Sequence, residues 1–156
     1  MFYYFDRSYQ KNRIFAALNF NEDMEKKDPI EEARRYVTNA EEVIKKAEYD
    51  SETKSYLDSK YIKTAGNILW GGCLVALDAL LQVRQGKGRP SIEKYKEAAG
   101  KRDRTLLKLL NAGYDTMHLS MGYDGNKSRK VCDSGFEYAN DIINHCARLM
   151  PVPVCA

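Results

Sequence analysis

The sequence predicts an all-α protein, an antiparallel bundle of four long helices and one short helix. Three observations favour this class. Apolar residues recur three and four positions apart through most of the chain, capping residues precede these stretches, and no stretch has the pattern of a strand. With 156 residues, of which 44% are hydrophobic and 30% charged, the chain has the size and composition of one folded domain.

We divide the chain into three parts. Residues 1–27 have no clear period and form an N-terminal appendage whose structure the sequence does not predict. Residues 28–150 form the helical bundle domain, and residues 151–156 form a C-terminal tail, because proline cannot continue a helix. No apolar run approaches the roughly 18 residues of a membrane span, and the N-terminus lacks a secretion signal. We therefore expect a cytoplasmic protein without a membrane partner.

The first helix begins at "DPIEE", where Asp28 can cap and Pro29 suits the first helical position. Its inward side is a narrow seam of apolar residues, namely Ile30, Ala33, Val37, Ala40, Ile44 and Ala47. A second helix, from about Leu57 to Val83, is apolar on two adjacent faces. It should therefore be the central helix, in contact with more than one neighbour.

Two features of the central helix each allow two interpretations. Asp78 is either a boundary residue facing solvent or a buried partner for a basic group, and we expect the first. Trp70 and the pair Gly71 and Gly72 indicate a close helix crossing, with a ligand pocket as the alternative.

The linker "RQGKGRPS" follows, and Ser91 then caps a short helix that ends at Gly100. Asp103 opens the next helix, whose inward positions are Leu106, Leu110, Tyr114, Met117 and Met121. We expect Gly122 to end this helix in the left-handed conformation, with a turn at "YDGNKS". A last helix should run from about Arg129 to Leu149.

The stretch "NAGYDTMHLSMGYDG" contains the candidate site for a ligand or partner. Residues Asn111, Tyr114 and His118 share one side of a helix and could line a polar groove between helices. The full candidate set is Asn111, Tyr114, Asp115, His118, Tyr123 and Asp124. A histidine at the edge of a core stripe is equally explained as a packing residue, and a tight turn explains "GYDG" without a function.

No enzymatic chemistry has a positive signal in the sequence. Ser120 and Asp115 project away from His118, so no nucleophile and base are paired, and His118 and His145 lack metal-ligand spacing. We therefore expect no catalytic residue, no cofactor and no metal. The four cysteines have no Cys-x-x-Cys spacing and are interpreted as buried or idle thiols: Cys73, Cys132, Cys146 and Cys155.

The net charge of +3 is too small to indicate a polyanionic partner, but it is unevenly distributed. Residues 84–108 hold nine basic and three acidic residues, a net charge of +6. If the protein binds nucleic acid, the contacts should come from this segment, through Arg84, Lys87, Arg89, Lys101, Arg102 and Arg104.

The strings "DSKYIKTAGNILWGGCLVALDALL" and "YDTMHLSMGYDG" resemble a family of small bacterial proteins with no assigned function. The order of elements and "GCLVALDALL" are more distantly similar to the HEPN fold, a helical bundle often found as a dimer and tied to toxin-antitoxin or defence systems. HEPN ribonucleases carry an arginine and a histidine that are separated by four to six intervening residues. His118 could be that histidine, but positions 111 to 113 hold Asn, Ala and Gly.

Without that guanidinium, the resemblance implies a non-catalytic interaction or regulatory protein. We expect it to form a homodimer and to bind a protein or ligand through the groove near Tyr114 and His118. The alternative is an RNA-binding protein or a degenerate HEPN-type ribonuclease.

Overall fold

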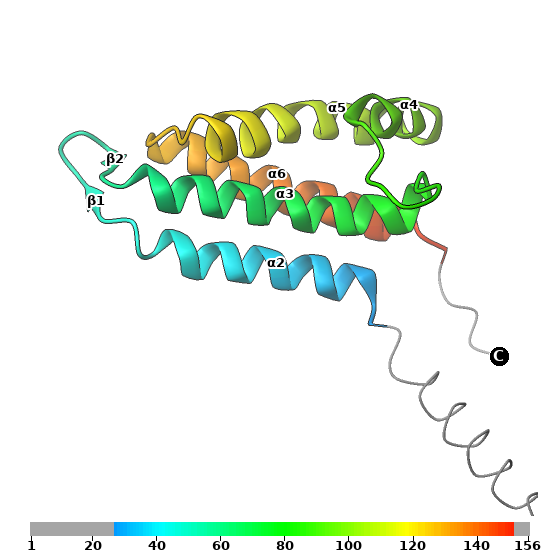
Figure 1. The fold of residues 1–156 in the computed structure, drawn as a ribbon, viewed down its shortest axis with the longest axis horizontal. Helices are drawn as coiled ribbons and strands as arrows, with labels where there is room; N and C mark the ends of the chain where they lie inside the picture. Colours follow the sequence, from blue (N-terminus) through cyan, green and yellow to red (C-terminus); the bar gives the residue numbers. More distant parts are fainter. Residues whose placement is uncertain (1–26, 152–156) are drawn as a thin grey trace, which may run out of the picture.

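The computed structural model describes residues 27–151, which form a mostly helical bundle (Figure 1). The elements in chain order are α2 (Pro29–Ile44), β1 (Tyr49–Asp50), β2 (Ser55–Tyr56), α3 (Ser59–Leu81), α4 (Ile92–Arg102), α5 (Arg104–Gly113), the π-helix η1 (Tyr114–Tyr123) and α6 (Arg129–Leu149). Helices α5 and η1 follow one another without a break. Over residues 27–151, the predicted all-α class, with four long helices and a short one, is confirmed.

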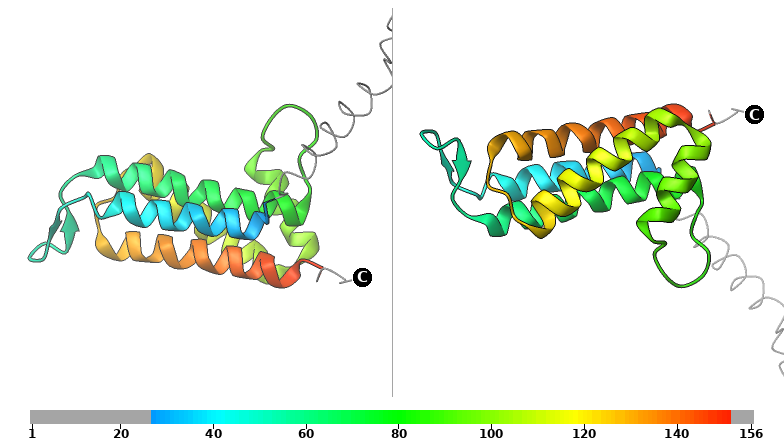
Figure 2. Two further views of the ribbon diagram at one scale, coloured as in Figure 1. Left: turned by 90° about the horizontal axis from the view of Figure 1, so that it is seen from below. Right: turned by 90° about the horizontal axis from the view of Figure 1, so that it is seen from above.

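Helices α2, α3, the α5–η1 helix and α6 run along the bundle in alternating directions, and α4 lies at one end (Figures 1 and 2). Helix α3 occupies one face, with α2 on one side of it, η1 on the other and α6 behind (Figure 1). It packs against α2, η1 and α6 and also contacts α4, as expected for the central helix. Helix α3 ends at Leu81, and the loop of residues 82–91 connects it to α4.

By length and hydropathy alone, α3 could cross a membrane, since an 18-residue window has a mean hydropathy of 1.4. Half of that window is buried inside the bundle. From the sequence, α3 is not counted as a possible membrane span because Asp78 interrupts its run of apolar residues. The core helix of a bundle has the same composition for a different reason, namely that other helices cover it.

The start of α2 follows the predicted capping. The Asp28 side chain accepts a hydrogen bond from the backbone N–H of Ile30 at 2.9 Å, and Pro29 is the first helical residue. The inward residues Ile30, Ala33, Val37, Ala40 and Ala47 are buried. The predicted seam is therefore correct, and only Ile44 is partly exposed.

The connection between α2 and α3 is a small antiparallel hairpin, so the prediction of no strand is wrong. Tyr49 pairs with Tyr56 and Asp50 with Ser55. The Asp50 carboxylate also accepts hydrogen bonds from the backbone of Glu52 and the hydroxyl of Thr53, which closes the turn. Strands of two residues are too short to produce an alternating pattern in the sequence.

The π-helix η1 packs closely against α3 because glycines remove side chains from the contact. A Cβ at Gly66 would lie 2.6 Å from the backbone oxygen of Met117, and one at Gly122 would lie 2.7 Å from Oδ1 of Asn67. Behind η1, a Cβ at Gly135 of α6 would lie 2.4 Å from the sulfur of Met121. Met117 and Met121 are fully buried between these helices.

The expected helix stop at Gly122 is wrong. The helix continues to Tyr123, and the backbone N–H of Asp124 still donates to the carbonyl of Leu119 at 2.9 Å. The left-handed residue is Gly125, with a φ of 67°. Gly122 is needed for the close contact with α3 and not for a positive φ.

Asp103 stands at the corner between α4 and α5. It follows the last residue of α4, so the expected end at Gly100 is two residues too early. Its carboxylate caps α5 by accepting from the backbone N–H of Leu106 at 2.7 Å. The same carboxylate oxygen accepts from Nε2 of His145 on α6 at 2.8 Å. One side chain thus holds three helices together.

Cys73, Cys132 and Cys146 are free and buried, as predicted for idle thiols. Burial raises the pKa of the Cys146 thiol to about 12, and burial followed by the charge of Asp133 raises that of Cys132 to about 12. A thiol with such a pKa is a poor nucleophile. The prediction for Cys155, and that for the appendage of residues 1–26, lie outside the described residues.

Candidate functional site

A cavity of about 250 Å³ opens on the side of α3 that faces η1 and the loop before α4. We call it the aromatic pocket. Its lining residues are Trp70, Leu74, Arg89, Pro90, Ile92, Tyr95, Tyr114 and His118. They come from α3, the 82–91 loop, α4 and η1, so the pocket exists only in the folded bundle.

Three aromatic rings form one wall of the aromatic pocket. The rings of Trp70 and Tyr114 meet edge to face, with centroids 5.4 Å apart. The His118 ring lies 5.1 Å from Tyr114 and 6.0 Å from Trp70. These distances are typical of favourable aromatic pairs. Trp70 is 44 residues from Tyr114 in the sequence, so this wall depends on the close packing of α3 and η1.

The His118 ring has an unusual feature. Its Nδ1 atom is buried and makes no hydrogen bond within residues 27–151. Leaving a buried polar atom unpaired costs about 1–3 kcal/mol. Native proteins contain few such atoms, and each calls for an explanation, of which a functional site is one. A packing residue that was fully satisfied by its neighbours would not have this feature.

Positive charge lies at the aromatic pocket. Arg89 lines it and makes no ion pair with any carboxylate of the described chain. Lys96 of α4 places its Nζ 5.2 Å from the centre of the Tyr114 ring. The guanidinium of Arg84, by contrast, lies 4.0 Å from the Asp78 carboxylate. The charges of Arg89 and Lys96 are therefore the ones available at this cavity.

Asp78 faces the interior, so the expectation that it faces solvent is wrong. The Tyr95 hydroxyl donates a hydrogen bond to Oδ1 of Asp78, and the Asp78 side chain is 17% exposed. Burial, followed by this hydrogen bond, raises the pKa of Tyr95 to about 12, and the charge of Arg89 partly opposes the rise. The alternative, a buried partner for a basic group, is met in part: Asp78 lies 4.0 Å from Arg84 and is hydrogen-bonded to Tyr95, but its side chain is only half-buried.

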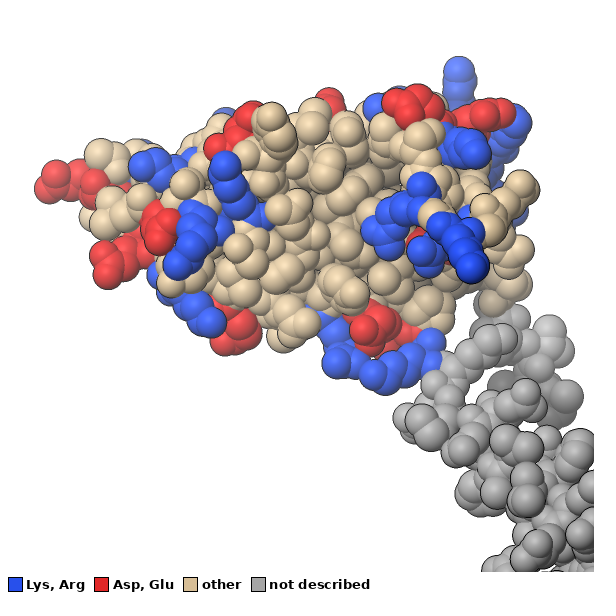
Figure 3. Space-filling view, in the orientation of Figure 1, with Lys and Arg blue, Asp and Glu red and all other residues tan. Residues whose placement is uncertain are grey.

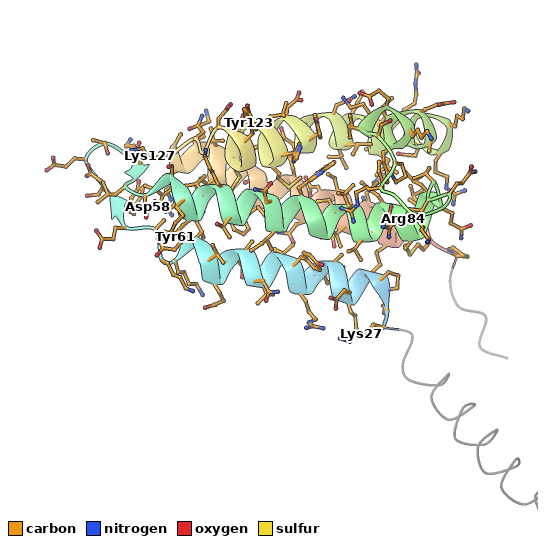
Figure 4. The ribbon with its side chains drawn as sticks, in the orientation of Figure 1. Lys27, Asp58, Tyr61, Arg84, Tyr123 and Lys127 are labelled. Carbon is orange, nitrogen blue, oxygen red and sulfur yellow. The ribbon has the colours of Figure 1, made fainter. Side chains whose placement is uncertain are left out.

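The structure separates the predicted site residues into two groups. Tyr114 and His118 line the aromatic pocket, whereas Asn111 is half-buried and does not line it. Asp115, Tyr123 and Asp124 are exposed, and the Tyr123 side chain is 77% exposed. Figure 4 shows Tyr123 on η1, nearer to the hairpin than to Arg84 at the far end of α3. These three residues lie on the surface and do not join His118.

The predicted nucleic-acid contacts are also divided. Arg84, Lys87 and Arg89 lie on the exposed loop after α3. The others lie at the α4–α5 corner, where Lys101 pairs with Glu97 at 2.6 Å and Arg102 donates to the carbonyl of Leu149 at 2.8 Å. Arg104 is exposed at the start of α5. The basic segment therefore presents two separate groups of charge.

Five residues that line the aromatic pocket were not predicted as site residues, namely Trp70, Leu74, Pro90, Ile92 and Tyr95. Arg89 was predicted only as a possible nucleic-acid contact. Trp70 was assigned to a helix crossing, and a crossing is present beside it, since a Cβ at Gly72 would lie 2.7 Å from Cβ of Tyr36 on α2. Trp70 also lines the cavity, and its alternative role in a ligand pocket stays a prediction.

A second surface is formed by the outer side of α3. No charged residue occurs between Lys63 and Asp78, and the outward positions include Asn67, Ile68, Gly71 and Val75. Figure 3 shows this face as a broad area without charged side chains, between groups of charges at the two ends of the bundle. A helix face that remained in water would normally carry charged residues.

The residues around the aromatic pocket could bind, stack on and neutralise a ligand. Across residues 27–151, no three side chains of His, Cys, Asp or Glu are grouped as metal ligands. The larger cavity between the hairpin and α6, about 580 Å³, is lined mainly by serines and charged side chains such as Lys54 and Glu137. One wall of the aromatic pocket is lined by three aromatic rings, one of them that of His118, whose Nδ1 makes no hydrogen bond within the described residues.

Fold and pocket together define a small helical-bundle protein with an aromatic cavity on one face. Residues 28–148 match the family described as a domain of unknown function, DUF5618, and the chain belongs to this family. A solved structure of a protein of unknown function from Dyadobacter fermentans is 33% identical and superposes with a TM-score of 0.72. The match covers 78% of this chain and 96% of that chain. No curated protein matches the sequence. The predicted likeness to a family without an assigned function is confirmed, and the HEPN-like relation stays a prediction.

Proposed function

We propose that this protein is a non-catalytic interaction protein that self-associates through the outer side of α3. The observation that carries the proposal is the uncharged face between Lys63 and Asp78. Ile68, Gly71 and Val75 follow one another at helical spacing along it and are all partly exposed. Burying this face against a second copy removes apolar surface from water, which is favourable.

Gly71 lies near the middle of α3, and this position suits a two-fold arrangement. A dimer of this kind brings the same patch of both subunits together. If the α3 helices of two copies cross near Gly71, Ile68 and Val75 of each copy lie on either side of the crossing. The Tyr36 ring of α2, 3.1 Å from the position of a Cβ at Gly71, then takes part in the contact. Small residues at a crossing allow two helix backbones to approach closely, as Gly72 already does toward α2.

The test is the molar mass in solution, measured by light scattering after size exclusion. We expect a dimer at micromolar concentrations, and we expect Val75→Glu to convert it to a monomer. Leu57→Glu is the matched control, because Leu57 is 56% exposed and lies before the start of α3. A wild-type protein that remained monomeric over this range would refute the proposal.

The second candidate is nucleic-acid binding, with or without cleavage. It is favoured by Arg89, which lines the same cavity as His118 although the sequence has no arginine just before that histidine. A filter-binding titration with RNA tests it. Affinity that falls steeply with salt supports the candidate, and no retention at low salt excludes it. If cleavage is found, His118→Ala should abolish it.

A further inference from the structure

We propose that the aromatic pocket binds a small planar ring that carries one anionic group, with the ring against Trp70, Tyr114 and His118 and the anion on Arg89. This inference is independent of self-association. It assigns a ligand class to a cavity that the uncharged face of α3 does not explain.

The walls favour a ring. Trp70, Tyr114 and His118 lie within 6.0 Å of one another and surround one side of the cavity. Leu74, Pro90 and Ile92 supply apolar surface on the other elements. Flat aromatic surfaces bind flat ligands well because they give a large contact area with few bonds to immobilise.

The charges favour an anion. Arg89 is at the cavity and has no carboxylate partner in residues 27–151, and a guanidinium can form two parallel hydrogen bonds with a carboxylate or phosphate. Lys96 lies close by, over the Tyr114 ring. The Asp78 carboxylate accepts a hydrogen bond from the Tyr95 hydroxyl and lies 4.0 Å from Arg84. Its ion pair is therefore with Arg84 and not with Arg89.

The volume limits the size of the ligand. Pockets for drug-sized molecules usually measure about 300–1,000 Å³, and this one measures about 250 Å³. A single or fused ring with one acidic group fits this space, whereas a dinucleotide does not. Carboxylates and phosphates share the required chemistry, so the experiment has one arm for each.

Trp70 makes the test specific, since it is the sole tryptophan of the chain and forms part of the wall. The full-length protein is titrated with benzoate and with phenyl phosphate, and binding is followed by Trp70 fluorescence and by calorimetry. Benzamide and phenol serve as neutral partners of the same ring. We expect at least one anion to bind about tenfold or more tightly than its neutral partner.

Two variants test whether Arg89 causes the preference for the anion. Arg89→Gln should remove the preference for the anion, and Lys87→Gln, in the same loop but outside the cavity, should retain it. Preference for benzoate alone assigns a carboxylate ligand, and preference for phenyl phosphate alone assigns a phosphate. The proposal is overturned if neither anion exceeds its neutral partner, or if Arg89→Gln and Lys87→Gln have equal effects.

Discussion

Asp103 accepts a hydrogen bond from Nε2 of His145 at 2.8 Å, which ties α6 to the corner between α4 and α5. On the other side of the ring, Nη2 of Arg148 lies 2.8 Å from Nδ1. A guanidinium can only donate, so Nδ1 accepts and the ring proton resides on Nε2, from which it is donated to Asp103. The hydrogen bonds therefore run from Arg148 to His145 and from His145 to Asp103, whose carboxylate also accepts from the backbone N–H of Leu106.

The Asp103 contact predicts an acid-sensitive contribution to stability. The backbone N–H of Leu106, followed by His145, lowers the pKa of Asp103 below its ordinary value of 3.8. A lowered pKa stabilises the fold above the ordinary value, and this stabilisation is lost as the pH falls through the folded value. We expect Asp103→Ala to lower the melting temperature at neutral pH and the difference from wild type to shrink below about pH 3.8. Asp141→Ala, at an exposed site of α6, is the control. A pH-independent difference would contradict the assignment.

The hydrogen bond from Tyr95 to Asp78 should make a contribution to stability that is lost at high pH. The pKa of Tyr95 is raised from 10.0 to about 12, so its contribution is complete below pH 10.0 and is lost as the pH rises toward 12. We expect Tyr95→Phe to reduce the free energy of unfolding by about 1.5–3 kcal/mol at neutral pH, the usual value for a hydrogen bond to a charged group. Urea unfolding of both proteins should show this gap closing above pH 10.0. A constant gap would mean that the hydroxyl acts only through packing.

The close contact between α3 and η1 can be tested by adding one methyl group at Gly66. A Cβ at Gly66 would lie 2.6 Å from the carbonyl oxygen of Met117 and 2.8 Å from the nitrogen of Gly122, both backbone atoms that cannot move aside alone. We expect Gly66→Ala to reduce the free energy of unfolding by about 1–3 kcal/mol or more. At Gly88 nothing lies within 4 Å of the added carbon, so Gly88→Ala should have little effect. Equal effects of the two substitutions would disprove the tight contact.

His118 can be tested without any knowledge of a ligand. His118→Phe keeps an aromatic ring against Tyr114 and removes the unpaired Nδ1. We expect the free energy of unfolding to stay the same or rise by about 1 kcal/mol, because a buried unsatisfied atom is eliminated. His118→Ala should lower it, since the ring contacts are lost. A large loss of stability in His118→Phe would show that the imidazole nitrogens are needed for folding.

Much of the fold could be predicted because local patterns specify it. Asp28 and Pro29 identify the start of α2, and the seam beginning at Ile30 and Ala33 identifies its inward side. The boundaries of α6 were predicted at Arg129 and Leu149, where they lie. These features depend on residues within a few turns of one another.

The parts that could not be predicted depend on contacts between distant residues. The inward spacing from Leu106 to Met121 fits an α-helix, and the change to a π-helix accompanies the glycine contacts with α3 and α6, which no local pattern reveals. Trp70 meets Tyr114 only after α3 and η1 pack. Arg89 belongs to a linker, whose position relative to His118 is decided by the placement of α4.

Because Tyr114 and His118 lie on a π-helix, the position of their rings depends on the number of residues between them as well as on which residues they are. Each of its hydrogen bonds encloses one residue more than in an α-helix, as between Asp124 and Leu119. Deleting one residue between Tyr114 and His118 would remove one step of the helical rotation and turn the imidazole around the helix axis relative to Tyr114. Relatives of different length in this segment would then present another side chain to the tryptophan. An insertion or deletion here is accordingly a change of binding surface, even where every aromatic residue is retained.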